Sequence, residues 1–394
     1  MTKFREQNTR QIMKDLVLIG GGHSHVIVLK MFGMKPLAGV RLTLITEAAN
    51  TPYSGMLPGH IAGFYSYDEC HINLQYLAQF AQAQLYIDRV IGLDLENKKV
   101  ICANQEAIAM DVVSIDIGST PATISVSGAA EYAIPAKPVS QLLQHWYQLI
   151  EDVRKPTEPI KIAVVGGGAG GVELSLSMLG NKQWEKENPS FEIDLFQRDA
   201  ELMPHYHRSM QRQVTQLLIK RGIRLHLKES VCKISPTLGE KATGKLDIIC
   251  ESGLKVECDR LFWVTQASAP QWLKSTGLAT DEQGFILVND TLQSLTHPYV
   301  FAAGDIATMV NHPRPKAGVF AVRQGKPLFD NLQRFLLGKP LKAYIPQKQY
   351  LSLIGTGDFR AIASRGSLTL PPHKLLWCLK DWIDRRFMQR FSQG

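Results

Sequence analysis

The chain has 394 residues, a formal net charge of +8, 45% hydrophobic residues and 20% charged residues. This is an ordinary composition for a soluble globular protein, and the length suffices for two domains or more. The positive charge suits anionic cofactors or an anionic membrane surface, but it is too small to indicate nucleic-acid binding.

Residues 1–14 carry no apolar secretion signal, and no uncharged apolar stretch is long enough to span a membrane. We therefore expect a cytoplasmic protein. None of the six cysteines lies in a C-x-x-C motif, and no histidine completes a zinc pattern, so we predict free thiols and no metal site. A closely spaced redox-active cysteine pair is absent, which excludes the usual chemistry of disulfide reductases.

Two segments of the chain share one pattern. Residues 16–19 form an apolar run that leads into Gly20-Gly21-Gly22, and residues 161–165 lead into Gly166-Gly167-Gly168. Apolar residues at helical spacing follow each glycine cluster, and a second strand is predicted at 40–46 and at 191–197. The pattern predicts an α/β protein with two Rossmann-like dinucleotide-binding folds.

The second glycine cluster reads Gly166-x-Gly168-x-x-Gly171. In this motif the first glycine permits a tight turn, the second lets the backbone approach a pyrophosphate, and the third lets the helix pack close to the strand. Amide groups at the helix N-terminus then bind the phosphates. We predict dinucleotide binding here.

The first cluster keeps Gly20 and Gly22, but His25 stands in place of the third glycine. We expect His25 to widen the contact between helix and strand while the phosphate site remains. His23 and Ser24 belong to the same turn, and we expect the histidines to shape it rather than to catalyse.

The residues that end the second strand of each unit differ. Glu47 can accept hydrogen bonds from an adenosine ribose, although it could also be a solvated strand-end acid. In the second unit, Gln197 and Arg198 replace the acid. An arginine can pair with a 2′-phosphate, which favours NADPH over NADH unless Arg198 is only a surface residue.

An apolar strand at 298–303 ends in Gly304-Asp305. This element is similar to the second FAD signature of flavoproteins with two dinucleotide folds, where the aspartate binds the ribityl or pyrophosphate group of the flavin. The order of the three elements resembles the pyridine nucleotide–disulfide oxidoreductase superfamily over residues 14–335. Residues 114–121, with Gly118, and residues 262–267, where Gln266 replaces a glycine, resemble the connecting strands of that superfamily.

The resemblance implies that the second fold is inserted in the first and that the cofactors are FAD and NADPH or NADH. The boundaries that follow are residues 14–150 and 271–338 for the FAD-binding domain, 151–270 for the NAD(P)-binding domain and 339–394 for a C-terminal region.

Residues 51–59, which include Pro52, are free of cysteine and resemble a loop of type II NADH dehydrogenases. Residues 168–174 resemble the same group, which implies that Glu173 faces the flavin and handles quinone protons. The alternative is an acid favoured by the helix dipole. The narrowest resemblance, over residues 20–26, 51–59 and 313–323, is to the flavoprotein module fused to some selenide, water dikinases. It implies a role in selenium or sulfur metabolism.

Gly318 and Val319 open a predicted helix after the Gly-Asp strand. We expect its N-terminus to face the flavin and Lys316 to add positive charge there, as a catalytic group. Lys137 is assigned no role beyond a surface charge.

A basic amphipathic helix is predicted at residues 374–391, with Trp377 and Trp382. Such a helix can lie on a membrane surface, as at the same end of type II NADH dehydrogenases, or pack against its own protein or a partner, including a second copy.

Three functions remain open. The first is an NAD(P)H dehydrogenase that passes electrons through flavin to a quinone-like acceptor. The second is a soluble reductase of a selenium or sulfur species. The third is a flavin-bound redox sensor without enzymatic activity.

Overall fold

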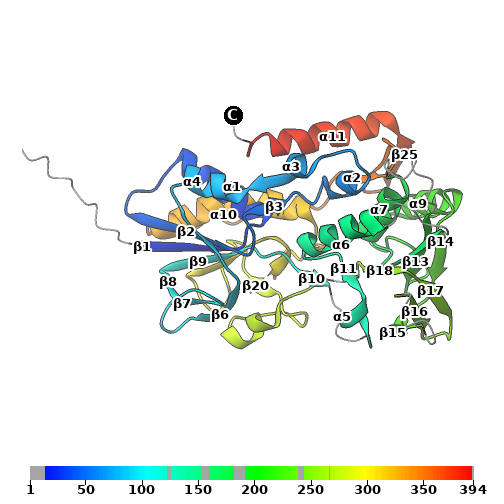
Figure 1. Cartoon of the computed structure of the whole chain (residues 1–394). Helices are drawn as coiled ribbons and strands as arrows, with labels where there is room; N and C mark the ends of the chain where they lie inside the picture. Colours follow the sequence, from blue (N-terminus) through cyan, green and yellow to red (C-terminus); the bar gives the residue numbers. More distant parts are fainter. Residues whose placement is uncertain are drawn as a thin grey trace, which may run out of the picture.

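The computed structural model describes residues 14–121, 126–152, 159–181, 191–237, 244–265 and 267–392. Gln266 and residues 153–158, most of the expected linker before the second unit, lie outside the described residues. The fold is α/β, as predicted. Figure 1 shows two main sheets at opposite ends of the molecule, with the C-terminal helix along one side.

The first sheet contains five parallel strands, of which all but the edge strand β5 are largely buried. Their apolar runs show no alternation with polar residues, as expected for a parallel sheet covered by helices. Helices α1 (His23–Met34), α4 (Leu74–Phe80) and α10 (Gly318–Leu336) belong to this unit. The strand order is β21 (Val300–Ala302), β9 (Val112–Ile115), β1 (Lys14–Ile19), β2 (Val40–Thr46) and β5 (Gln84–Ile87).

The second sheet repeats this arrangement with five further parallel strands. Helices α6 (Val139–Asp152), α7 (Ala169–Leu179) and α9 (Arg208–Lys220) accompany it. The strand order is β11 (Ile134–Pro135), β18 (Arg260–Trp263), β12 (Ile160–Val165), β13 (Phe191–Gln197) and β14 (Arg224–Leu227).

The late strand β21 completes the first sheet. Val300 lies opposite Val113 of β9, so the chain returns to the first unit after it has formed the second sheet. The second fold is thus inserted in the first, as expected, while the exact domain boundaries remain a prediction.

Short elements surround the two sheets. In the first unit, the loop after β2 forms β3 (Asn50–Pro52), α2 (Leu57–Ile61), α3 (Tyr67–Cys70) and β4 (His71–Asn73). The remaining elements are β6 (Val90–Asp94), β7 (Lys99–Cys102), β8 (Ile108–Ala109), β10 (Thr120–Pro121), α5 (Ala129–Tyr132), β15 (Val231–Pro236), β16 (Leu246–Cys250), β17 (Lys255–Cys258), β19 (Ala267–Ser268), η1 (Gln271–Thr276), β20 (Ile286–Val288), η2 (Gly304–Ile306) and β22 (Ala307–Met309).

The C-terminal region forms a three-stranded antiparallel sheet followed by one helix. The sheet contains β23 (Ser352–Gly355), β24 (Ala361–Arg365) and β25 (Leu368–His373), and the helix is α11 (Lys374–Met388). Helix α11 lies beside α3 (Figure 1). In the part of the chain that the structure describes, no helix is long and apolar enough to cross a bilayer.

Helix α11 is amphipathic, and it packs on the protein with only part of its apolar surface. The side chains buried against the protein are Trp377, Lys380, Asp384 and Phe387. Much of the apolar stripe recognised in the sequence points outward instead, with Leu375, Leu379, Trp382 and Ile383 exposed. The helix therefore both packs on its own protein and presents an apolar outer face.

Candidate functional site

The glycine turn of the second unit has the geometry that the motif predicts. Gly166 has a φ of +123°, which only glycine adopts readily. A Cβ on Gly171 would lie 1.9 Å from the Gly166 carbonyl oxygen, so the helix can approach the strand only with glycine there. A Cβ on Gly168 would meet nothing within 4 Å, and the space in front of the α7 N-terminus is therefore open.

The glycine turn of the first unit has the same backbone, with a φ of +93° at Gly20 and extended conformations at both Gly22 and Gly168. His25 is buried in place of the third glycine. Its Nδ1 lies 2.7 Å from the Gly20 carbonyl oxygen and its Nε2 lies 2.8 Å from Ser114 Oγ. The histidine thus joins α1, the turn and β9 through hydrogen bonds.

The other two polar residues of this turn also contact distant segments. Ser24 is buried and its hydroxyl donates to the Ala321 carbonyl of α10 at 2.7 Å. The His23 ring lies edge-on to Tyr53, with ring centroids 5.5 Å apart, and accepts from the Ser54 amide at 3.4 Å. Burial lowers the pKa of His23 to about 4, so the ring is neutral at pH 7.

Gly304 and Asp305 lie where β21 ends, beside the same turn. The Gly304 amide donates to Gln324 Oε1 at 2.7 Å, which fixes the Gly-Asp turn on α10. Asp305 accepts from the Lys137 ammonium at 2.7 Å and from Ser119 Oγ at 3.4 Å. Lys137, for which we expected only a surface charge, is therefore part of this site.

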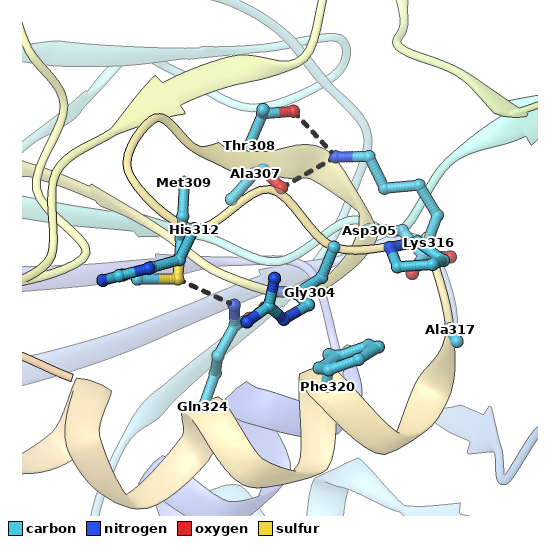
Figure 2. Close-up of a pocket in the computed structure, with 12 residues that line it drawn as sticks. Gly304, Asp305, Ala307, Thr308, Met309, His312, Lys316, Ala317, Phe320 and Gln324 are labelled. Atoms are coloured by element: carbon cyan, nitrogen blue, oxygen red, sulfur yellow. Dashed lines mark hydrogen bonds between the residues drawn. The ribbon is translucent and has the colours of Figure 1, made fainter. Parts of the chain in front are cut away.

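The Lys316 side chain binds β22 and does not pair with Asp305. Its ammonium donates to the Ala307 carbonyl at 2.7 Å and to Thr308 Oγ1 at 2.9 Å (Figure 2), and it lies 3.9 Å from the centre of the Phe285 ring. Burial lowers its pKa to about 8. Lys316 lines a small pocket together with Asp305, but its own hydrogen bonds hold it on β22.

Helix α10 begins at Gly318, followed by Val319, as predicted. A Cβ on Gly318 would lie 2.9 Å from Ser54 Oγ, so the start of α10 closely approaches the loop that follows β3. Pro52 ends β3, opposite His71 of β4. The α10 N-terminus and the loop around Pro52 therefore lie at one place, next to the first glycine turn.

Glu173 lies on α7 and reaches the C-terminal region. Its Oε1 accepts from the Gly355 amide of β23 at 2.7 Å. Burial raises the pKa of Glu173 to about 7, while Lys380 of α11 acts against this shift and Asp384 adds to it. A carboxyl group with a pKa near neutral can release or accept a proton at neutral pH.

Lys380 and Asp384 form a buried ion pair on the inner face of α11, with a distance of 2.7 Å. The Lys380 ammonium also donates to the Gly55 carbonyl, and Asp384 Oδ1 accepts from the Tyr53 hydroxyl at 3.1 Å. The helix thus binds the loop that carries Pro52 and places charged groups where they act electrostatically on Glu173.

The strand-end residues of the two units are placed differently from each other. Glu47 follows β2 and is exposed. Gln197 is buried and turns into its own glycine turn, where Oε1 accepts from the Gly167 amide at 2.9 Å and Nε2 donates to Asp199 at 2.6 Å. Arg198 is exposed, with Nε 4.0 Å from Asp199.

Comparison with known proteins identifies the family. Residues 14–325 match the family described as pyridine nucleotide-disulphide oxidoreductase. The chain belongs to this family.

Similar proteins agree with this assignment. Ferroptosis suppressor protein 1 of Xenopus laevis is 26% identical over 303 residues, which cover 75% of this chain and 76% of the relative. The type II NADH:quinone oxidoreductase of Haemophilus influenzae is 22% identical over 91% of this chain and 87% of its own length. The structure of NDH2 from Plasmodium falciparum with NADH has a similar fold, with a TM-score of 0.79 at 14% identity over 96% of this chain and 97% of that chain.

As a member of the family, the protein is an oxidoreductase that uses FAD and NAD(P)H, which confirms the predicted cofactors. The narrower likeness to the module of selenide, water dikinases remains a prediction. Among the described residues, no group of three or more His, Cys, Asp or Glu side chains could hold a metal ion.

Most of the first unit fits FAD. A Cβ on Gly118 would meet nothing within 4 Å, so space is open there, and Asp305 and the α10 N-terminus flank the first turn. The Asp116 carboxylate is the group that does not fit a bound FAD. Asp116 places its carboxylate on the first amides of α1, with Oδ2 2.8 Å from the Ser24 nitrogen.

Sequence reasoning missed three functional candidates: Lys137, Lys380 and Asp116. Lys137 lies within residues 134–138, a segment with two prolines, and Lys380 is one of the basic residues of the amphipathic helix predicted at 374–391. Asp116 carried a signal that could have been used, because a charged residue there interrupts an otherwise apolar strand that leads into Gly118.

Proposed function

We propose that the protein is an NAD(P)H:quinone oxidoreductase. In the overall reaction, NAD(P)H, a proton and a quinone yield NAD(P)⁺ and a hydroquinone. Bound FAD supplies the chemistry that links a two-electron donor to this acceptor. The printed name of the Haemophilus influenzae relative supports a quinone as the acceptor.

The observation that carries the proposal is the position of Glu173. A quinone takes up two protons when it is reduced, so its site needs a group that can donate one at neutral pH. Glu173 has a pKa of about 7 and lies where α7, β23 and α11 meet. The Lys380 ammonium, on the inner face of α11, is paired with Asp384 and acts electrostatically on Glu173.

The state of the cysteines argues against disulfide chemistry. All six cysteines are free. Burial raises the pKa of Cys70, which lies nearest to the Pro52 loop in sequence, to about 12, so this thiol is a poor nucleophile.

The residues at the end of β13 favour one of the two nucleotides as the electron donor. Because Gln197 binds its own turn, no acidic side chain at this position would repel a 2′-phosphate. Arg198 is exposed, and its 4.0 Å contact with Asp199 is loose enough to be exchanged for a phosphate. We therefore propose NADPH as the preferred donor, and we expect Arg198→Ala to raise KM for NADPH about tenfold while KM for NADH stays unchanged.

The outer face of α11 supports contact with a membrane surface. Leu375, Leu379, Trp382 and Ile383 are exposed on this helix, and Leu368 and Leu370 of the neighbouring β25 are exposed as well. Arg386 lies 5.1 Å from the Trp382 ring and adds positive charge beside it. An apolar face with a basic border suits an anionic bilayer, where quinones dissolve.

The test is anaerobic mixing of the purified protein with NADPH or NADH, followed by a short-chain ubiquinone. We expect flavin absorbance to bleach with the nucleotide and to return with the quinone, in repeated turnover. The conservative variant Glu173→Gln should still bleach but should re-oxidise at least tenfold more slowly. Re-oxidation by selenium or sulfur species and not by quinone would contradict the proposal, and a flavin that neither nucleotide bleaches would point to a sensor.

A further inference from the structure

Asp116 occupies the place where the first fold is expected to hold a phosphate. It follows β9 directly, and only 2% of its surface is exposed. Its carboxylate Oδ2 accepts from the Ser24 amide at 2.8 Å and from the His25 amide at 3.1 Å. These amides belong to the first turn of α1, whose N–H groups bind the dinucleotide phosphate in this type of fold.

The second fold provides an internal comparison. The Asp116 amide donates to Ile19 of β1, and in the same way the Val264 amide donates to Val165 of β12. The carbonyl of Asp116 faces Gly20 as the carbonyl of Val264 faces Gly166. Asp116 and Val264 are therefore equivalent positions, and the two folds differ there by a carboxylate and an isopropyl group.

This difference decides whether the phosphate position is open. A Cβ on Gly168 would meet no atom within 4 Å, whereas a Cβ on Gly22 would lie 2.3 Å from Asp116 Oδ1. The same oxygen lies 2.4 Å from the Cβ position of Gly304. The chain's own anion therefore fills the space between the α1 N-terminus and the Gly-Asp turn.

The charged and titratable groups around Asp116 do not neutralise it. The nearest acid, Asp305, is paired with Lys137 at 2.7 Å. His23 and His25 face the same region, and burial lowers the pKa of each to about 4, so both are neutral. Burial, with Asp305 as a further contribution, raises the pKa of Asp116 to about 7, although the two amides oppose the shift.

A pyrophosphate that arrives beside an ionised and buried Asp116 would place like charges together in a region of low dielectric. Either the carboxylate leaves the amides or it takes up a proton. We propose that Asp116 is an internal competitor for the FAD pyrophosphate, and that binding of FAD is coupled to protonation of Asp116. This inference depends on the assignment of FAD to the first fold.

The sign of the coupling follows from linkage. At a pH below the pKa of Asp116, the carboxyl group is already neutral, so the affinity for FAD should not depend on pH. Above that pKa the binding of each FAD must be accompanied by the uptake of one proton from solvent. The Kd for FAD should therefore rise about tenfold per pH unit. Asn at this position carries no charge and, like the neutral acid, accepts more weakly than a carboxylate from the two amides. The pyrophosphate should therefore displace it equally well at every pH, and binding should stay tight throughout.

The test is calorimetric titration of the full-length chain, freed of FAD, with FAD between about pH 6 and about pH 9. Two buffers of different ionisation enthalpy report the number of protons taken up. We expect the wild-type Kd to rise with pH and proton uptake to approach one per FAD. Asp116→Asn should show a flat Kd and no uptake from this group.

Asp111→Asn is the matched control, because Asp111 lies at the opposite end of β9, where it accepts from the Asp15 amide at 2.7 Å. This variant should keep the wild-type pH dependence. The inference is overturned if wild-type Kd is flat over this range, or if Asp116→Asn keeps the dependence. If neither protein binds FAD at any pH, the assignment of FAD itself fails.

A reciprocal variant tests the same point in the second fold. Val264→Asp places a carboxyl group in front of the open α7 N-terminus and should weaken NAD(P)H binding progressively as the pH rises. FAD content and the circular dichroism spectrum should match those of the wild type. Unchanged NAD(P)H affinity in this folded variant would count against a carboxyl group at this position as a competitor.

Discussion

Lys137 and Asp305 are joined by an ion pair of 2.7 Å, although 167 residues of chain separate them. The pair connects the segment that enters the inserted fold with the Gly-Asp turn that follows it. Ser119 accepts from the same ammonium at 2.9 Å, so three segments of the chain meet at Asp305.

We expect Lys137→Met to weaken FAD binding about fivefold, because Asp305 would lose its charge partner beside the flavin site and the pair is partly exposed. Titration of the FAD-free protein with FAD measures the change. Lys326→Met is the control, since Lys326 forms an exposed pair with Asp330 on α10 at 2.6 Å. Equal affinity of wild type and Lys137→Met would remove Lys137 from the site.

The pKa of Glu173 predicts the pH dependence of quinone reduction. The folded state raises this pKa to about 7, so the group is protonated below pH 7 and ionised above it. At saturating NADPH, quinone turnover should therefore fall as the pH rises above about 7, by up to tenfold per pH unit. The pH profile of Glu173→Gln should be flat and lower. Glu131→Gln, at an exposed position on α5, should leave the profile unchanged.

Gly171 and Gly170 provide a matched pair of substitutions on α7. Gly171→Ala would place a Cβ 1.9 Å from the Gly166 carbonyl, so we expect a loss of about 2 kcal/mol in the free energy of unfolding and poor NAD(P)H binding. Gly170→Ala would meet only Val264, at 3.4 Å, and should be neutral or slightly stabilising. Thermal unfolding and NADPH titration distinguish the two. Similar behaviour of both variants would contradict the close packing of helix and turn.

The outer face of α11 is best tested by single substitutions, because deletion of the helix would also remove Trp377 and Lys380, which pack against the protein. Trp382→Ser should reduce binding to anionic liposomes at least tenfold, given about 1.5–3 kcal/mol for burial of a large apolar side chain. Ile219→Ser, at an exposed position on α9, is the control. Liposome binding that both variants retain in full would refute the membrane contact.

Much of the fold could be predicted from the sequence because its signals are local. The two glycine turns, the apolar strands beside them and the Gly-Asp strand each lie within a few consecutive residues, and the structure forms them at those positions. The chain order of these signals was enough to indicate the inserted arrangement, which Val300 beside Val113 then confirms.

The details of the site depend on contacts between distant segments, and they could not be predicted in the same way. Lys137 and Lys316 are both lysines near the flavin signature in the expected fold, and nothing local indicates that Lys137 pairs with Asp305 while Lys316 binds β22. Likewise, helical periodicity showed an apolar stripe on α11 but did not indicate which face would pack on the protein. The buried face includes the Lys380–Asp384 pair, because its hydrogen-bond partners Gly55 and Tyr53 lie in the loop that carries Pro52.

The position of β21 in the first sheet has a consequence for biosynthesis. The strands of the inserted sheet end at Trp263, so a ribosome-bound nascent chain already contains all of them before it contains Val300. The first sheet, by contrast, stays open beside β9 until residues 300–302 have left the ribosome exit tunnel. The nicotinamide-nucleotide fold can therefore mature during translation, whereas the flavin fold waits for the C-terminal third of the protein. Newly made chains would pass through a stage at which they can bind the electron donor before they can hold the flavin.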